Sequence, residues 1–320
     1  MLECRDLLGH RGLGKAELVR GGREGPMAGH GHERAQEIRF HAISISNGPM
    51  PNHRWPNGRA ATTIMHMRTN NQTRTAKVAL VGDRSLHVRS HMRIPGLVEA
   101  LRQQDGLALD AYWVPTDGVP ATRLDGFDGI WLLPGSPYRS EAGAVLAART
   151  AREQGIAYLA TCAGFQHTLL DFARNVCALA EANHAESTPD ADNLLIVPLA
   201  CSLVGHEGAV DLTPGSTAER ILGVERTVER YHCAYGLNPT YVDVLRAHGL
   251  RFTGHHDGDV RIAELPEHPF FLATLFQPEL SGDGTRCHPI VRAFAEAAVA
   301  HAAGGVARPE PAVAAQARGI

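Results

Sequence analysis

The sequence predicts an α/β fold with a mainly parallel central sheet and helices on both faces. In the first half of the chain, short apolar runs typical of buried strands alternate with segments of helical spacing. In the second half, strand-like segments follow one another closely, which predicts a smaller antiparallel, strand-rich part. With 320 residues, of which 44% are hydrophobic, the chain is long enough to bury a sizeable core.

The elements of the first half follow from apolar runs that end near glycine or polar turns. We expect strands at 77–82, 109–114, 129–133 and 156–161. Helical spacing predicts helices at 95–104, 140–154 and 164–180. Glu141 would lie in the first turn of the second helix, where a carboxylate interacts favourably with the helix dipole. This alternating order predicts parallel strands joined by crossover helices.

The second half contains more strands than helices. We expect strands at 194–199, 210–213, 227–237, 251–255, 260–264 and 270–276. A helix should begin after Asn238, because Pro239 suits a first helical position. A last helix is predicted at 289–303. The folded domain is therefore expected to span residues 76–303.

The two ends of the chain differ from this domain. Residues 1–75 are rich in Gly, Arg, His and Asn without periodicity, which predicts a disordered extension, with Met65 or Met67 as alternative natural starts. The basic charge of this segment leaves a nucleic-acid or membrane arm as the other interpretation. Residues 304–320 are predicted to form a flexible tail.

Composition excludes several classes of function. The net charge of -3 gives no sign of a nucleic-acid or membrane partner, and no apolar run is long enough to span a bilayer. The scattered cysteines contain no C-x-x-C pair, so we expect reduced thiols in a cytoplasmic protein. His30 and His32 alone make a weak metal site, and we expect neither a metal nor a cofactor.

A candidate nucleophile stands between the strand at 156–161 and the helix that follows it. In A-T-C-A-G-F-Q, Cys162 occupies a tight strand–turn–helix elbow. The dipole and free N–H groups of a helix N-terminus favour a thiolate, and the N–H of Ala163 could donate to a developing oxyanion. The other interpretation is a packed, unreactive cysteine, which is how we read Cys177, Cys201 and Cys287.

A second stretch, L-L-P-G-S-P, follows the strand at 129–133. Its Gly135 and Ser136 could direct backbone N–H groups at an anion or oxyanion. Many turns between a strand and a helix have a similar sequence. This stretch therefore indicates an oxyanion site only in combination with the cysteine elbow.

Together these motifs resemble the class I, triad-type glutamine amidotransferase domain, in particular the C-terminal domain of CTP synthase. The resemblance covers about residues 77–300. It rests on motifs in matching order: L-P-G at 133–135, T-C-A-G-F-Q at 161–166, D-F-A-R-N-V at 171–176, V-E-R at 228–230, Y-x-x-N at 235–238, H-P-F-F at 268–271 and F-x-P-E at 276–279. It implies a flavodoxin-like sheet and a glutamine-hydrolysing site.

The resemblance also implies roles for individual residues. In the family a cysteine attacks the glutamine amide, a histidine moves the proton, and a glutamate orients that histidine. Cys162 and Glu279 stand at two of these places, but the histidine place holds Gln277, whose amide cannot shuttle a proton. Ordinary glutamine hydrolysis is therefore not expected.

The implied substrate contacts are only partly present. Gln166 belongs to the elbow motif, and Glu186 matches the glutamate that holds the substrate amino group. Ala234 occupies the place of the arginine that holds the α-carboxylate. The loss of such a buried charged contact typically costs several kcal/mol of binding. We therefore expect a small amine-bearing substrate other than glutamine.

Other histidines could supply the missing base. On the expected strand at 227–237, His232 would share a face with Ala234 and point into the pocket. His184 precedes Glu186 by two residues, and His167 lies on the elbow helix. Each could equally be an ordinary hydrogen-bonded or solvated histidine.

Two functions remain open from the sequence. The first is a stand-alone, CTP synthase-related enzyme, hydrolase-like, that uses Cys162 for amide or related C–N bond chemistry. The second is a catalytically silent binding or regulatory module that keeps the fold but has a degenerate triad. No synthase domain is recognised before residue 77, so ammonia released at this site would have no acceptor site in this chain. A homodimer and a partner synthase subunit both stay open as assemblies.

Overall fold

The computed structural model describes residues 75–304. The expectations for the basic extension and the tail, including His30, His32, Met65 and Met67, fall on residues outside this range.

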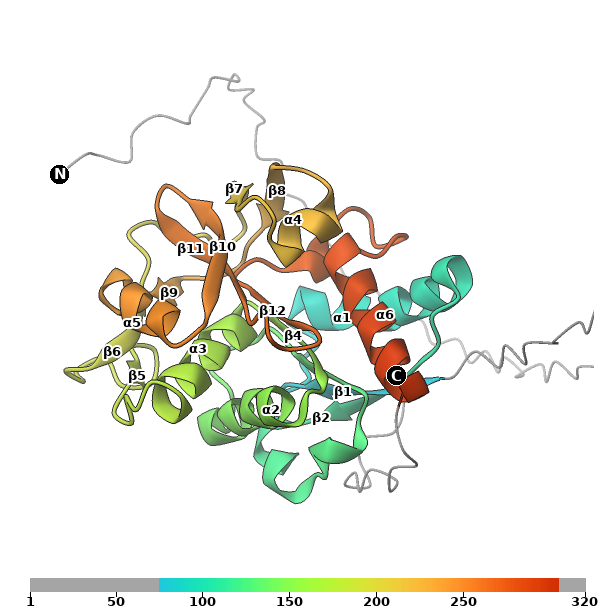
Figure 1. Cartoon of the computed structure of the whole chain (residues 1–320), viewed down its shortest axis with the longest axis horizontal. Helices are drawn as coiled ribbons and strands as arrows, with labels where there is room; N and C mark the ends of the chain where they lie inside the picture. Colours follow the sequence, from blue (N-terminus) through green and yellow to red (C-terminus); the bar gives the residue numbers. More distant parts are fainter. Residues whose placement is uncertain (1–74, 305–320) are drawn as a thin grey trace, which may run out of the picture. The chain divides into compact units, whose positions relative to one another are not determined.

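The central element is a nine-stranded sheet whose first half is parallel (Figure 1). The parallel strands run in the order β2-β1-β3-β4-β12. Their bounds are Ala76–Val81 for β1, Leu109–Val114 for β2, Gly129–Leu132 for β3, Ala157–Thr161 for β4 and Phe271–Thr274 for β12. The predicted α/β class is confirmed, since buried and mainly apolar strands form a parallel sheet between helices.

The sheet continues beyond β12 through antiparallel strands in the order β11-β10-β7-β8. These strands are Asp259–Glu264 (β11), Arg251–His256 (β10), Glu207–Leu212 (β7) and Arg226–Arg230 (β8). A separate three-stranded sheet contains Asn183–His184 (β5), Leu194–Pro198 (β6) and Tyr235–Leu237 (β9). The predicted strand-rich part therefore extends the main sheet and adds a small second one.

The prediction of a single strand at 227–237 was wrong. β8 ends at Arg230 in the large sheet, and β9 starts at Tyr235 in the small sheet. The crossing segment, residues 231–234, bonds instead to the chain at 199–206: Leu203 N–H donates to Cys233 O, and Tyr231 N–H donates to His206 O. Since residues 231–234 are not extended strand, the alternation that placed His232 and Ala234 on one face does not apply.

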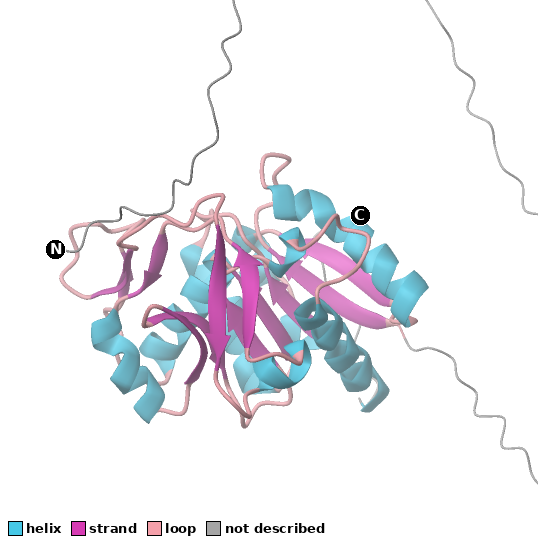
Figure 2. Cartoon of the chain, turned by 90° about the horizontal axis from the view of Figure 1, so that it is seen from above, coloured by secondary structure: helices cyan, strands magenta, loops and turns pink. Residues whose placement is uncertain are grey.

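Helices cover both faces of the parallel half, as Figures 1 and 2 show. Helices α2 (Glu141–Gln154) and α3 (Ala163–Asn175) pack together on one face against β3 and β4. Helix α6 (Pro289–Gly304) contacts β1, β3 and β4. Helix α6 packs closely against β3: a Cβ added at Gly129 would lie only 2.9 Å from the Phe294 ring. None of the helices within 75–304 combines the length and apolar character needed to cross a membrane.

The remaining helices are shorter or differ from the predicted bounds. Helix α1 runs from Arg89 to Ala100, earlier than predicted, and continues as a π-helical turn, Leu101–Asp105. Helix α3 ends at Asn175 rather than at residue 180, since Ala178 has a positive φ of 56° that a helix cannot contain. The others are α4 (Thr217–Leu222) and α5 (Val242–Ala247), with 3₁₀ turns at Thr116–Ala121, Leu124–Gly126, Pro239–Tyr241 and Pro278–Leu280.

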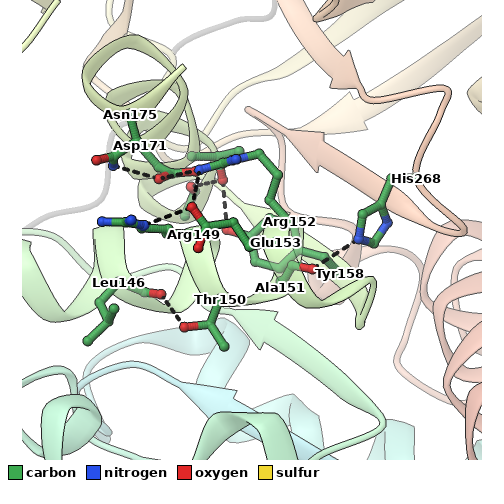
Figure 3. A network of polar contacts seen from close by, with 12 residues as sticks. Leu146, Arg149, Thr150, Ala151, Arg152, Glu153, Tyr158, Asp171, Asn175 and His268 are labelled. Atoms are coloured by element: carbon green, nitrogen blue, oxygen red, sulfur yellow. Dashed lines mark hydrogen bonds and ion pairs between the residues drawn. The ribbon is translucent and has the colours of Figure 1, made fainter. Parts of the chain in front are cut away.

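A polar network joins α2 to α3 (Figure 3). Arg152 of α2 donates from Nε to Asp171 Oδ2 of α3 at 2.9 Å, and Asn175 donates to the other carboxylate oxygen. Arg174 of α3 pairs with Glu141 at 2.8 Å. The D-F-A-R-N-V motif therefore holds the two helices together, away from the cysteine elbow, and keeps the helix that starts at Ala163 in place.

Candidate active site

The cysteine elbow is built where β4 meets α3. Cys162 lies between them with φ 54° and ψ -110°, a conformation that L-residues rarely adopt. Its N–H donates to Thr274 O at 2.8 Å, so the turn begins directly at the end of the β4–β12 pairing. A Cβ at Gly164 would lie 2.3 Å from Leu132 O, which explains why glycine occupies this first turn of the helix. Strand and helix thus fix the cysteine from both sides.

The Cys162 side chain lines a pocket of about 520 Å³. Gly135, Ser136, His232 and Gln277 line the same pocket. The other polar or charged lining residues are His87, Arg89, His206, Glu207, Arg230 and Tyr231. The N–H of Ala163 has no acceptor within the helix, because Ala163 is the first residue of α3. A thiol, a helix N-terminus and a turn with a positive-φ glycine therefore meet in one place.

The Gly135–Ser136 loop is held by a buried histidine. His91 Nδ1 accepts the Ser85 N–H, so the Nε2–H donates to Pro134 O at 2.7 Å, and burial lowers the pKa of His91. Gly135 has a φ of 114°, which strongly favours glycine. On the outer side, Ser136 Oγ donates to Glu186 Oε1 at 3.2 Å. This contact places the Glu186 carboxylate beside the loop.

Gln166 and His184 form a buried chain behind the pocket. His184 Nδ1 accepts the Glu186 N–H, and His184 Nε2 therefore donates to Gln166 Oε1 at 3.0 Å. Gln166 Nε2 donates to Tyr235 O at 2.9 Å. Burial lowers the pKa of His184 to about 3, so the ring stays neutral at ordinary pH. Both nitrogens of His184 are used, and the ring is not placed to accept a proton from Cys162.

Gln277 and Glu279 follow β12 at the carboxyl edge of the sheet. Gln277 lines the pocket, and its N–H donates to Arg230 O at 2.8 Å. Glu279 is wholly buried: Oε1 accepts from Thr161 Oγ1 at 2.6 Å, while Oε2 has no hydrogen-bond partner. Burial raises the pKa of Glu279 to about 7, against the opposing effects of Thr161 and the nearby Trp131 indole. This carboxyl group is thus poised between its two protonation states near neutral pH.

A second thiol faces the elbow. Cys233 Sγ lies 2.7 Å from Cys162 Sγ and donates to Leu275 O at 3.1 Å. His232 is exposed, and its carbonyl oxygen, rather than its ring, lies 3.6 Å from Cys162 Sγ. Within residues 75–304, no histidine ring hydrogen-bonds to Cys162, and no three His, Cys, Asp or Glu side chains are grouped to bind a metal.

The family model of class-I glutamine amidotransferases matches residues 96–297, most of the region that the structure describes. This chain belongs to the class-I glutamine amidotransferase family. The match confirms the resemblance inferred from the motifs around Cys162 and Glu279.

Among curated relatives, the amidotransferase chain is similar to CTP synthases. It is 34% identical over 263 residues to that of Rubrobacter xylanophilus, covering 76% of this chain and 47% of the relative. It is 32% identical over 249 residues to that of Methanococcoides burtonii, covering 72% and 46%. The chain thus spans about half the length of the curated relatives it matches.

A solved structure shares the fold of this amidotransferase. The glutaminase domain of Trypanosoma brucei CTPS, solved with bound acivicin, superposes with a TM-score of 0.65 at 23% identity. The match covers 76% of this chain and 99% of that domain.

The amidotransferase pocket brings together half of the site residues expected from the sequence: Gly135, Ser136, Cys162, His232 and Gln277. Glu186 reaches its edge through Ser136, and Ala163 lies directly behind Cys162. Gln166, Ala234 and Glu279 are not among the lining residues. His167 is also buried, with Nδ1 bonded to Ala163 O at 2.8 Å.

The sequence reasoning missed Cys233 and the pocket residues His87, Arg89 and His206. The first was hidden by the expected strand, on which residue 233 would point away from 232 and 234. The others lie on loops or at the start of α1, where residue spacing carries no signal about a shared pocket.

Proposed function

We propose that this chain is an amidotransferase-like enzyme in which Cys162 attacks an amide or related C–N carbon of a small amine-bearing substrate. The observation that carries this proposal is the position of Cys162: a strained elbow at a helix N-terminus, opening into a pocket shared with Gly135 and Ser136. A helix N-terminus favours the thiolate, and strained backbone is often found at reacting groups.

In the proposed reaction, the Cys162 thiolate adds to the substrate carbonyl carbon. The N–H groups of Ala163 and the Gly135–Ser136 loop stabilise the resulting oxyanion. The C–N bond then breaks as the amine takes a proton from water, and the hydroxide left behind adds to the thioester carbon, so that the C–S bond breaks and the Cys162 thiolate leaves. Gln277 positions that water or the substrate by hydrogen bonds, because an amide cannot take its proton. Glu279 is buried behind the pocket, where its carboxylate holds the end of β4 through the hydrogen bond from Thr161.

The substrate contacts proposed here differ from those for glutamine. The Glu186 carboxylate, beside Ser136, is suited to a substrate amino group. Ala234 provides no charge for a carboxylate. Arg89 lines the pocket and makes no ion pair within residues 75–304, so it offers a cation at a different place. A substrate whose acidic group lies elsewhere than in glutamine fits this arrangement.

Covalent labelling tests the nucleophile. We expect acivicin or a glutamine-like diazo-ketone to add its mass to the tryptic peptide 153–174, which contains Cys162 and no other cysteine. Mass spectrometry of the intact chain and of this peptide measures the adduct. Cys162→Ser should remain unlabelled, and Cys177→Ser should be labelled like the wild type. An unlabelled wild-type peptide, with the Cys162→Ser control behaving identically, would contradict the nucleophile role.

A binding or regulatory module is the second candidate, because no histidine ring hydrogen-bonds to Cys162 in the described part of the chain. We expect the wild type not to hydrolyse glutamine, since Gln277 cannot act as a base. Glutamate release by the wild type and by Gln277→His separates the candidates. Hydrolysis gained in the variant favours an enzyme whose pocket accepts glutamine, and no activity in either favours another substrate or a binding role.

A further inference from the structure

Two thiols from distant parts of the chain meet at the elbow. Cys162 Sγ and Cys233 Sγ are 2.7 Å apart, although 71 residues separate them in sequence. The bond length of a disulfide is about 2.05 Å, so the two sulfur atoms need to approach by only about 0.7 Å. Of the four thiols free in the described part of the chain, Cys177 and Cys287 have no such neighbour.

The two thiols differ in access. Cys162 lines the pocket, whereas Cys233 is 3% exposed and donates to the backbone at Leu275. Burial raises the pKa of Cys233 well above its usual value, so this second thiol stays protonated. A small oxidant entering the pocket therefore meets the accessible Cys162 sulfur first and the buried Cys233 sulfur directly behind it.

We propose that Cys162 and Cys233 form a reversible redox pair, in which hydrogen peroxide or another small hydroperoxide converts the two thiols into an intramolecular disulfide. The Cys162 thiolate attacks the peroxide oxygen, the O–O bond breaks, and a sulfenic acid and hydroxide (an alkoxide from an organic hydroperoxide) result. The Cys233 sulfur then attacks the Cys162 sulfur, the S–O bond breaks, and the departing hydroxide takes the Cys233 proton and leaves as water while the disulfide forms. The peroxide gains the two electrons that the thiols lose, and an external thiol reverses the reaction.

This modification takes the elbow sulfur out of reach of any substrate. It also protects Cys162 from irreversible oxidation, because a neighbouring thiol condenses with a sulfenic acid before a second peroxide does. The inference needs only the geometry of the two thiols and does not depend on amide chemistry at Cys162.

Peptide mapping of the full chain tests the pair. The protein is reduced, freed of reductant, treated with hydrogen peroxide, alkylated with iodoacetamide and digested with trypsin without reduction. Cys162 and Cys233 fall in separate peptides, 153–174 and 231–246, each with a single cysteine. We expect a linked species of these two peptides, a matched loss of both alkylated peptides, and recovery of both after dithiothreitol.

Two variants sharpen the test. In Cys233→Ser, Cys162 should accumulate as a sulfenic acid that dimedone traps, and then as a sulfinic acid. In Cys177→Ser, which removes another buried thiol, the linked peptides should form as in the wild type. Wild-type Cys162 found as sulfinic acid beside fully alkylated Cys233 would overturn the inference, as would Cys162 that stays fully alkylatable. Electrophile labelling of the reduced protein reports separately on the proposed function.

Discussion

Replacing Arg152 with methionine is expected to lower the free energy of unfolding by about 3–5 kcal/mol, the usual cost of removing one partner of a buried ion pair. The Asp171 side chain has no exposed surface, and Arg152 approaches both of its oxygens, at 2.9 and 3.4 Å (Figure 3). Without the guanidinium, Asn175 is the remaining side-chain donor to this carboxylate. Urea unfolding of the wild type and the variant at pH 7 measures the difference.

Arg149 provides a matched control on the same helix. Its pair with Glu153 is exposed, with side chains 48% and 41% accessible, so Arg149→Met should cost no more than about 0.5 kcal/mol. Burial already raises the pKa of Asp171, so the loss in Arg152→Met should shrink at low pH, where the carboxyl takes up a proton. Equal costs for the two variants would contradict a buried ion pair between α2 and α3.

Glu279→Gln is expected to stabilise the protein at pH 8 by about 3 kcal/mol and to change little at pH 4.5. In the folded chain the pKa of Glu279 is raised to about 7, because burial disfavours the carboxylate. A raised folded pKa contributes stability that is complete below the unfolded value of about 4.5 and is lost as pH rises through about 7. The glutamine variant carries no such charge. Free energies of unfolding across this pH range measure the effect.

Glu264 is the matched control for this substitution. It too is buried, but both of its oxygens accept hydrogen bonds, from Thr217 N–H, Ala218 N–H and Thr253 Oγ1. In Glu264→Gln an amide NH₂ would face these donors, so we expect destabilisation at pH 8 by about 1–3 kcal/mol. The same chemical change should therefore have opposite signs at the two glutamates. If the effect of Glu279→Gln on the free energy of unfolding did not change with pH, the raised pKa of Glu279 would be contradicted.

The parallel half of the fold could be read from the sequence because its central strands, β3, β4 and β12, are buried along their whole length and appear as uninterrupted apolar runs. The edge strand at 109–114 is only partly buried, and it also matches the structure residue for residue. The sequence patterns gave wrong predictions where contacts between distant parts of the chain determine the local structure. The run at 227–237 has strand-like composition throughout, but its middle is drawn away by backbone bonds to residues 199–206. Helix α1 begins six residues before Pro95. The prediction placed its start at Pro95, because proline is common at the first position of a helix.

Residues of the candidate site could be predicted where a reactive or oxyanion-binding residue stands in a recognisable turn after a strand. The elbow at Cys162 and the loop at Gly135 each combine a strand end with a turn, and both line the pocket. The histidine candidates were not resolved by sequence, because neutral packing and catalysis use the same residue type. His184 illustrates this: both ring nitrogens are engaged with Gln166 and the Glu186 backbone. Spacing along the chain cannot reveal Cys233 either, since its position depends on the path between two sheets.

That path has a mechanical consequence. Cys162 is anchored in the rigid parallel frame, whereas Cys233 sits on a four-residue bridge whose backbone is tied to the loop at 199–206. The wall of the pocket at Cys162 therefore comes from the end of β4, and the wall at Cys233 comes from the crossing between the two sheets, which also bonds to Leu275 just after β12. A disulfide between the two sulfur atoms would tie this crossing covalently to the end of β4 and close a ring over the 71 residues that separate the two cysteines.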